Sequence, residues 1–482
     1  MARKKLDPPV TVRMFRQGLG DCFLITVGDT QPKHILIDCG MWEATPERRR
    51  RLEECVGEIK RLTGSLDLLV VTHEHWDHVS GFSQCRAQFE KLPFKRLLMA
   101  WTEDPADAVA GEIRQKVAAL RMNLRDVIRA AREARVPLAE LPDSLLPIND
   151  LEPRPTRVLS AAGGLGVANS PSDAMTWLKT RAEESPECEF ICARPGRVIE
   201  DIPGIRIYVL GPPRSEDELR KADGGARARR AGESYLHMDA ALGLEEDLAA
   251  GAAGSIFAAR GRAGGSQVSD PGLPFRRGSG SSLDELTPHD EYFRRSYGER
   301  AGPHRWRRID SDWTSSITQL ALRMDKFTNN TSLVLAIELV GSGRVLLFPG
   351  DAQFGNWNSW DSVKFEKFPQ VNAEDLLRRT VLYKVGHHGS HNATLRLKGL
   401  DRMTSPDLIA MIPVDEAFAR RQPHGGWKMP YPALYQDLKS RTGGRILRSD
   451  TGLPALKEVT PQLRSAFQKM VATSPLSITL KL

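Results

Sequence analysis

The chain has 482 residues, of which 40% are hydrophobic and 27% are charged, so it can bury a sizeable core. It lacks an apolar run of about 18 residues and its basic first residues lead into no apolar segment, so we expect neither a membrane-spanning helix nor a signal peptide. Six scattered cysteines with no framework indicate reduced thiols in a cytoplasmic protein. A net charge of +7 permits an anionic substrate such as nucleic acid without requiring one.

The first 63 residues predict a β-hairpin or meander followed by a helix. Alternating or continuous apolar residues at 10–15, 22–27 and 34–38 predict three strands. Residues 46–63 have the spacing and charge of a helix. Asp38 ends the third strand, where its carboxylate either orients a metal ligand or caps the turn.

A dense group of metal-binding residue types follows the next strand. The apolar strand at 68–71 leads directly into His73, His75, Asp77 and His78. Imidazole and carboxylate are the usual ligands of hydrolytic zinc, and catalytic sites keep one position open for water. A loop at a strand end can turn all four side chains inward, whereas an extended strand would alternate them. We interpret the segment as a metal site rather than a polar turn whose histidines only form hydrogen bonds.

Two long segments separate this motif from the next ones. Residues 102–204 predict a mainly helical insertion, because apolar residues recur at three- and four-residue steps before prolines interrupt them. A core strand is expected at 205–213. Residues 214–310 are rich in Gly, Ala and Arg and predict a second, flexible insertion. Its two arginine clusters, at 227–230 and at 305–308 with Trp306, fit a nucleic-acid contact or a solvated, partly disordered segment. Its sixteen acidic residues balance fifteen Arg and one Lys.

Two later strands also end in residues that bind metals. One apolar run ends in a carboxylate at Asp351, and another ends in the paired His387 and His388. A serine nucleophile is conceivable at Ser390, but the G-x-S-x-G elbow is absent and the histidine pair is better explained as a ligand source. No P-loop is present, because no glycine-rich run is followed by Lys-Ser/Thr.

These motifs in this order resemble the metallo-β-lactamase superfamily of metal-dependent hydrolases. The segments Gln17-Gly-Leu-Gly-Asp-Cys-Phe-Leu-Ile25 and Asn329-Asn-Thr-Ser-Leu-Val-Leu335 are similar to the hydrolase domain of the ComEC group, the DNA-uptake proteins of competent bacteria, and its soluble relatives. The resemblance covers about residues 10–100, 205–213 and 312–450. It implies an α/β fold, the four-layer αββα sandwich, with halves at 1–101 and 311–482 and the two insertions between them.

The resemblance also implies two divalent metal ions, zinc or manganese. One ion would be held by His73, His75 and Asp351 with Asn330, and the other by Asp77, His78, Asp351 and one of His387 and His388. Most of the superfamily supplies a third histidine where this chain has Asn329 and Asn330, and a neutral amide suits a harder ion such as Mn²⁺ better. Asp21 and Asp38 are expected behind the ligands, and the expected catalytic residues are Asp77, Asp351, His388 and His424.

The function implied is hydrolysis of a phosphodiester in DNA or another nucleic acid, in DNA processing or in defence against foreign DNA. The unused histidine of the pair, or His424, would give a proton to the leaving group. One alternative is hydrolysis of a small ester, lactone or thioester. Another is a catalytically weak interaction subunit. A protein partner would use the insertions at 102–204 and 214–310, and no membrane partner is expected.

Overall fold

The computed structural model describes residues 7–43, 45–133, 170–221, 290–297, 324–422, 426–454 and 456–482. The chain divides into two compact units, one of residues 1–118, 146–239 and 323–482, and one of residues 119–145 and 240–322. The described part of the second unit is helical: the later part of α4 (Ala108–Glu133) and α11 (Glu291–Tyr297). The insertions predicted at 102–204 and 214–310 are each divided between the two units.

The first unit contains an eight-stranded sheet, whose order is β14-β15-β1-β2-β3-β4-β5-β6. From β15 to β3 its neighbours are antiparallel, and from β3 to β6 they are parallel. Its strands are β1 (Val10–Phe15), β2 (Cys22–Val27), β3 (Lys33–Cys39), β4 (Leu68–Val70), β5 (Arg96–Ala100), β6 (Glu189–Ala193), β14 (Val471–Thr473) and β15 (Ser477–Lys481).

The same unit contains a seven-stranded sheet, in the order β13-β12-β11-β10-β9-β8-β7. Strands β7 to β10 pair antiparallel, and β10 to β13 pair parallel. Its strands are β7 (Val198–Ile199), β8 (Ile205–Gly211), β9 (Val334–Leu339), β10 (Val345–Phe348), β11 (Thr380–Lys384), β12 (Ile409–Ile412) and β13 (Ile446–Arg448).

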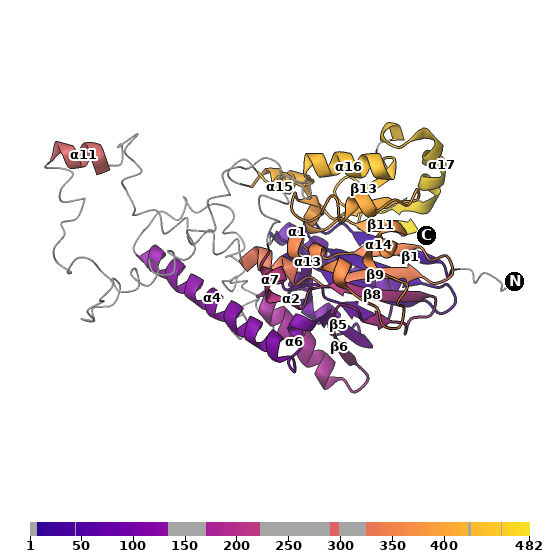
Figure 1. Cartoon of the computed structure of the whole chain (residues 1–482), viewed down its shortest axis with the longest axis horizontal. Coiled ribbons are helices and arrows are strands. Elements are labelled where there is room, and N and C mark those ends of the chain that lie inside the picture. Colours follow the sequence, from indigo (N-terminus) through magenta and orange to yellow (C-terminus); the bar gives the residue numbers. More distant parts are fainter. Residues whose placement is uncertain are drawn as a thin grey trace. The chain divides into compact units, whose positions relative to one another are not determined.

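The two sheets and the helices on their outer faces form four layers in the first unit (Figure 1). The core between the sheets takes alternate residues from both, such as Val12 of β1 and Ile337 of β9. The other face of the eight-stranded sheet is covered by α1 (Pro46–Leu62), α2 (Trp76–Gln84) and α6 (Pro171–Glu184). The other face of the seven-stranded sheet is covered by α13 (Phe354–Ser359), α14 (Ala373–Arg378) and α16 (Pro432–Thr442). The expected αββα sandwich is confirmed.

Local signals explain several of these elements. Helix α1 begins after Thr45, whose hydroxyl accepts a hydrogen bond from the amide of Arg48, and Pro46 occupies the first turn. Further helices of the first unit are α3 (Arg86–Phe89), α7 (Glu216–Arg220), α15 (Glu416–Arg420) and α17 (Pro461–Met470). The six cysteines are free thiols. In the part of the chain that the structure describes, no helix combines the length and hydropathy needed to cross a membrane.

The parallel parts of the two sheets determine where functional side chains gather. Strands β3 and β4 are parallel neighbours, so their carboxyl ends meet at one sheet edge. Strands β10, β11 and β12 are also parallel neighbours, and their carboxyl ends meet at an edge of the other sheet. The segments that follow β4, β10 and β11 contain seven of the residues singled out above: His73, His75, Asp77, His78, Asp351, His387 and His388.

Candidate metal centre

The motif after β4 is divided between a loop and a helix. His73 lies in the loop, His75 is the N-cap residue of α2, and Asp77 and His78 lie in its first turn. A helix amino terminus favours a carboxylate because the free amides and the helix dipole place positive charge there. The structure therefore differs from the expected single loop, since helical geometry turns Asp77 and His78 toward the sheet ends.

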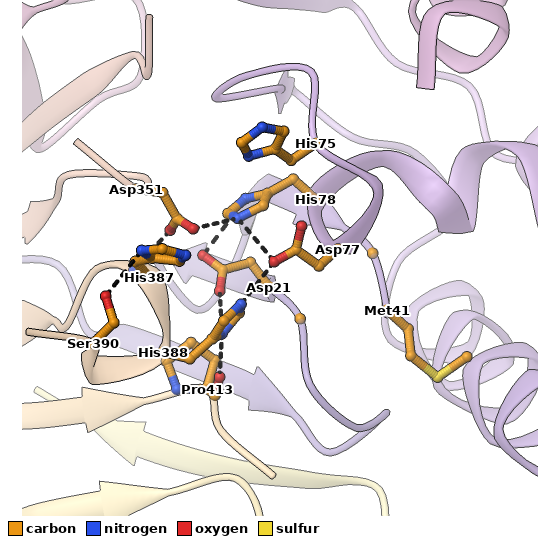
Figure 2. Close-up of polar contacts among 12 residues, drawn as sticks. Asp21, Met41, His75, Asp77, His78, Asp351, His387, His388, Ser390 and Pro413 are labelled. Atoms are coloured by element: carbon orange, nitrogen blue, oxygen red, sulfur yellow. Dashed lines mark hydrogen bonds and ion pairs between the residues drawn. The ribbon is translucent and has the colours of Figure 1, made fainter. Parts of the chain in front are cut away.

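Four buried side chains from both sheets converge at one point (Figure 2). Asp77, His78, Asp351 and His388 each offer one ligand atom, and these atoms all lie within 4.8 Å of one another. His388 Nε2 is 2.7 Å from Asp77 Oδ2, and His78 Nε2 is 3.2 Å from Asp351 Oδ2. Two imidazoles and two carboxylates at these separations form a donor set suited to a divalent transition metal.

The unused hydrogen-bonding capacity of this group fits a metal ion. His78 Nε2 and Asp77 Oδ1 are buried and have no hydrogen-bond partner among the described residues. The opposite ring nitrogens are fixed: His78 Nδ1 lies 2.8 Å from Asp38 Oδ2, and His388 Nδ1 lies 2.6 Å from the carbonyl of Pro413. Such partners hold an imidazole with its other nitrogen toward the metal. The four side chains are therefore arranged as ligands.

The electrostatics of the centre follow from opposite charges in a buried space. Burial raises the pKa of a carboxyl group, but His78 and Lys384 hold the pKa of Asp351 well below its ordinary value. Burial lowers the pKa of an imidazole, but neighbouring carboxylates, with Asp351 the strongest, raise the pKa of His78. The carboxylates consequently stay ionised, as metal ligands must be.

His73 and His75 lie beside this group with two ring nitrogens facing each other. His73 Nε2 is 3.0 Å from His75 Nδ1. His73 Nδ1 lies 3.1 Å from the hydroxyl of Thr72, which itself donates to Asp38. Burial, with the charge of His78, lowers the pKa of His73, and burial lowers the pKa of His75 to about 4. Both rings stay neutral near pH 7 and keep a lone pair for a metal.

The side-chain amide of Asn330, expected among the metal ligands, forms hydrogen bonds within the fold. Its oxygen accepts a hydrogen bond from the backbone of Asn356 at 3.1 Å, and its nitrogen donates to the carbonyls of Leu219 and Lys221. These bonds join the start of β9 to α7 and α13. The Asn330 amide therefore bonds to surrounding backbone groups, which differs from the metal-ligand role that the resemblance implied.

The paired histidines have different surroundings. His388 is buried and belongs to the four-residue group, whereas His387 is half-buried with Nδ1 2.9 Å from Ser390 Oγ. The His387 amide donates to Asp351 Oδ1 at 2.8 Å. His424 lies outside the described residues. Of the expected site residues that the structure describes, all except Asn330 are brought together.

The comparisons with known proteins agree with this geometry. Residues 16–93 match the family model described as the metallo-beta-lactamase superfamily. The match supports this superfamily. No curated protein matches the chain. The matched segment contains Asp38 and the motif from His73 to His78, while Asp351 and His388 come from outside it and join them only in the fold. The family match and the His/Asp group together support a metal-dependent hydrolase.

Backbone conformation adds to the case for a functional site on this αββα fold. Among the described residues, three non-glycine residues have a positive φ: Asp38 at 54°, His387 at 44° and His388 at 54°. Left-handed backbone is strained for residues with a side chain, and such strain concentrates at functional sites. Each of the three contacts or belongs to the metal-ligand group.

Sequence reasoning missed three polar residues at the centre. Lys384 is a buried lysine inside the apolar strand β11, Thr72 hydrogen-bonds Asp38 and His73, and Asp325 lies 3.6 Å from His75 Nε2. A lysine within an apolar strand was a visible signal, because lysine is almost never fully buried without a partner. Asp325 had a weaker signal, its position four residues before Asn329 at helical spacing. Thr72 had none.

Proposed function

We propose that the protein is a metal-dependent phosphodiesterase that cleaves nucleic acid. The observation that carries the proposal is the buried group of Asp77, His78, Asp351 and His388, in which His78 Nε2 and Asp77 Oδ1 form no hydrogen bond with the described residues. Divalent metal ions held by these residues would supply a water of lowered pKa and neutralise the charge that develops on a phosphodiester. A separate side-chain nucleophile is then unnecessary.

The remaining steps belong to the chain's own residues. Asp38 and the carbonyl of Pro413 hold His78 and His388 in one ring orientation. We assign protonation of the leaving oxygen to His387, whose Nδ1 donates to Ser390 Oγ because Ser390 Oγ itself donates to Asn392 Oδ1. The second proton of a charged His387 would then be carried by Nε2. His424 remains a further candidate for this step.

Aromatic residues near the centre favour nucleic acid as the substrate. Trp42 and Trp427 are half-buried with ring centroids 5.8 Å apart, and Phe418 lies 6.2 Å from Trp427. Both tryptophans belong to segments that adjoin the centre. Trp42 lies two residues after Gly40, which packs against the backbone of Asp77. Trp427 lies four residues before Tyr431, whose amide donates to the carbonyl of Gly389 at 2.7 Å. Bases of single-stranded nucleic acid stack on such rings. The similarity of residues 17–25 to the ComEC group and the net charge of +7 point to the same substrate class.

The test compares three substrate classes on the purified chain with added Mn²⁺, Mg²⁺ or Zn²⁺: single- and double-stranded DNA and RNA, the small phosphodiester bis-p-nitrophenyl phosphate, and p-nitrophenyl acetate. We expect DNA or RNA cleavage that weakens steeply with salt, because phosphate binding releases counterions. Asp351→Ala should abolish it, and the exposed Glu366→Ala serves as the charge-matched control.

The Trp427→Ala variant separates nucleic acid from smaller substrates. Loss of one stacking ring should raise the KM for oligonucleotides about tenfold, since base stacking contributes roughly 1–3 kcal/mol. It should leave turnover of the small phosphodiester unchanged. Hydrolysis of the acetate ester alone would contradict the nuclease proposal and favour a small-ester hydrolase. Bound metal without any hydrolysis would contradict catalysis.

A further inference from the structure

An arginine in the first turn of α1 joins two segments that border the metal centre. Arg48 Nε donates to Glu43 Oε2 at 3.0 Å, and its Nη2 group donates to Asp415 Oδ2. Glu43 belongs to the connection between β3 and α1, and Asp415 belongs to the segment that follows β12. The three side chains are at most 29% exposed, so water and salt screen these ion pairs only partly.

The segment after β12 is held at two points. The carbonyl of Pro413 lies 2.6 Å from His388 Nδ1, so the segment begins at the metal centre. Asp415 caps α15, because its Oδ1 accepts a hydrogen bond from the amide of Phe418 at 2.9 Å while its Oδ2 binds Arg48. The pairing with Arg48 therefore fixes the start of α15 against α1. Without the arginine, its two carboxylate partners would repel each other and separate the two segments.

Three aromatic rings belong to the segments that Arg48 joins. Trp42 lies between β3 and α1, and its ring centroid is 5.8 Å from that of Trp427. The ring of Trp427 is 6.2 Å from Phe418 in α15, and its amide donates to the carbonyl of Ala419. Both ring pairs are T-shaped and all three rings are partly exposed, so a planar base can still stack on them.

Positive charge near these rings suits a polyanionic ligand. Arg421 directly follows α15 and Lys428 directly follows Trp427, and both residues are exposed. Aromatic rings combined with cations are the usual means of binding single-stranded nucleic acid, because bases stack on the rings while the cations attract phosphates. The occupant that fits this surface is therefore an unpaired stretch of a nucleic-acid strand.

We propose that Arg48 is the positioning residue of a binding surface for an unpaired nucleic-acid base, formed by Trp42, Phe418 and Trp427. It acts through its two carboxylate partners, which hold the ring-bearing segments together, and it does not touch the substrate. The proposal deepens the nucleic-acid function proposed above and rests on it. The surface contains no metal ligand, so binding can be measured without metal and apart from hydrolysis.

The first experiment measures binding in the absence of metal. A short fluorescein-labelled oligothymidylate is titrated with the full chain in EDTA, and its anisotropy gives the Kd. Arg48→Ala should raise the Kd about tenfold, the effect of losing one stacked base. Arg49→Ala is the matched control, because Arg49 pairs with Glu53 within α1 and bonds the carbonyl of Gln84. It should bind as the unaltered chain does.

A combined variant distinguishes positioning from direct contact with the strand. Trp427→Ala and the combination of Arg48→Ala with Trp427→Ala should weaken binding by similar factors, because the arginine acts through the rings. A direct contact between Arg48 and a phosphate would instead give independent losses, about 100-fold in the combined variant. The coupling between the two substitutions therefore decides which role Arg48 has.

Kinetics on a cleaved oligonucleotide should show the same role. We expect Arg48→Ala to raise the KM about tenfold with kcat nearly unchanged, whereas a general loss of structure would lower kcat and the unfolding midpoint together. Arg48→Lys should restore part of the affinity, since an ammonium can bond one carboxylate but lacks the fork of a guanidinium. It is also the substitute if Arg48→Ala does not fold, and a Kd between those of the unaltered chain and Trp427→Ala is then expected.

Three results would overturn the proposal: no binding of the oligothymidylate by the unaltered chain, an unchanged Kd in Arg48→Ala, or independent losses in the combined variant. Binding with the expected coupling but no hydrolysis of nucleic acid would support the surface while the proposed phosphodiesterase function fails. Hydrolysis with unchanged binding in Arg48→Ala would have the opposite meaning. The two claims therefore fail separately.

Discussion

Lys384 Nζ lies 3.2 Å from Asp351 Oδ1, and both side chains are at most 2% exposed. The same ammonium pairs with Asp21 and donates to the carbonyl of Gly350 at 2.9 Å. Although burial lowers the pKa of a lysine, Asp21 and Asp351 hold that of Lys384 above its ordinary value. Because Oδ1 of Asp351 is held by Lys384 and by the His387 amide, Oδ2 is left facing His78.

Replacing Lys384 should therefore destabilise the metal-free chain. Lys384→Met leaves two buried carboxylates without their cation, and breaking a buried pair costs about 3–5 kcal/mol. We expect this loss in the free energy of unfolding measured by urea denaturation without metal. Excess Mn²⁺ should recover part of it, because metal binds only the native site. Equal stability of both proteins without metal would contradict this role.

Asp38 should control the metal affinity of the four-residue group. Asp38→Ala removes the acceptor of His78 Nδ1 and the partner of the Thr72 hydroxyl. We expect the affinity for Mn²⁺ at that group to fall about 10–100-fold in calorimetric titration. Glu366→Ala should bind as the unaltered chain does. An unchanged affinity in Asp38→Ala would show that the ring of His78 needs no support.

Gly40 permits the close approach of β3 and α2 behind the centre. A side-chain carbon at Gly40 would collide with the backbone of Asp77 and His78. Gly40→Ala should therefore lower the free energy of unfolding by about 1–3 kcal/mol and weaken metal binding. Gly57→Ala is the matched control, because nothing lies within 4 Å of an added carbon there. That change in the interior of α1 should stabilise the chain by about 0.5–1 kcal/mol.

Asp107 should make the free energy of unfolding depend on pH in the acidic range. Its carboxylate accepts from Arg214 at 2.7 Å, Arg194 at 2.9 Å and the Ala110 amide in the first turn of α4. The hydrogen bond from Arg214, the strongest cause, lowers the pKa of Asp107 from 3.8 to about 2. Its contribution is thus fully present above pH 3.8 and is lost as the pH falls through about 2.

The Asp107→Ala variant tests that dependence. We expect a loss of about 1–2 kcal/mol at pH 7, from the helix cap and from partly exposed ion pairs. The difference between the two proteins should shrink as the pH approaches 2. Thermal unfolding at pH 7, 4 and 2 measures it, and a difference that does not change with pH would rule out the carboxylate as the cause.

The fold and most of the metal centre could be predicted because local sequence patterns indicate the strands and the ligand residues. Apolar runs at 10–15, 22–27 and 68–71 became β1, β2 and β4, and the residues after β4 were recognisable by their side-chain chemistry alone. The pairing of β1 with β15 was not predictable, because its partner strand lies more than 460 residues away and its identity depends on the whole sheet.

The different environments of adjacent residues could not be predicted from the sequence either. Asn329 and Asn330 are chemically identical, and His387 and His388 are too, yet the fold gives each member a different set of partners. Backbone direction decides which of two neighbours faces the centre, and that direction follows from α13, α7 and β12 packing around them. Lys384 differs, because its buried position in β11 could have been inferred from the apolar residues on both sides.

The antiparallel pairing of β1 with β15 also allows the order of the strands along the chain to be changed by circular permutation. Thr11 lies opposite Lys481, so the two strand ends can be joined by a short designed linker. New ends opened in the exposed turn at residues 29–32 would yield a circularly permuted protein with the same sheets. In that protein Asp21 would follow His388 in sequence, while the architecture of the metal centre would be unchanged.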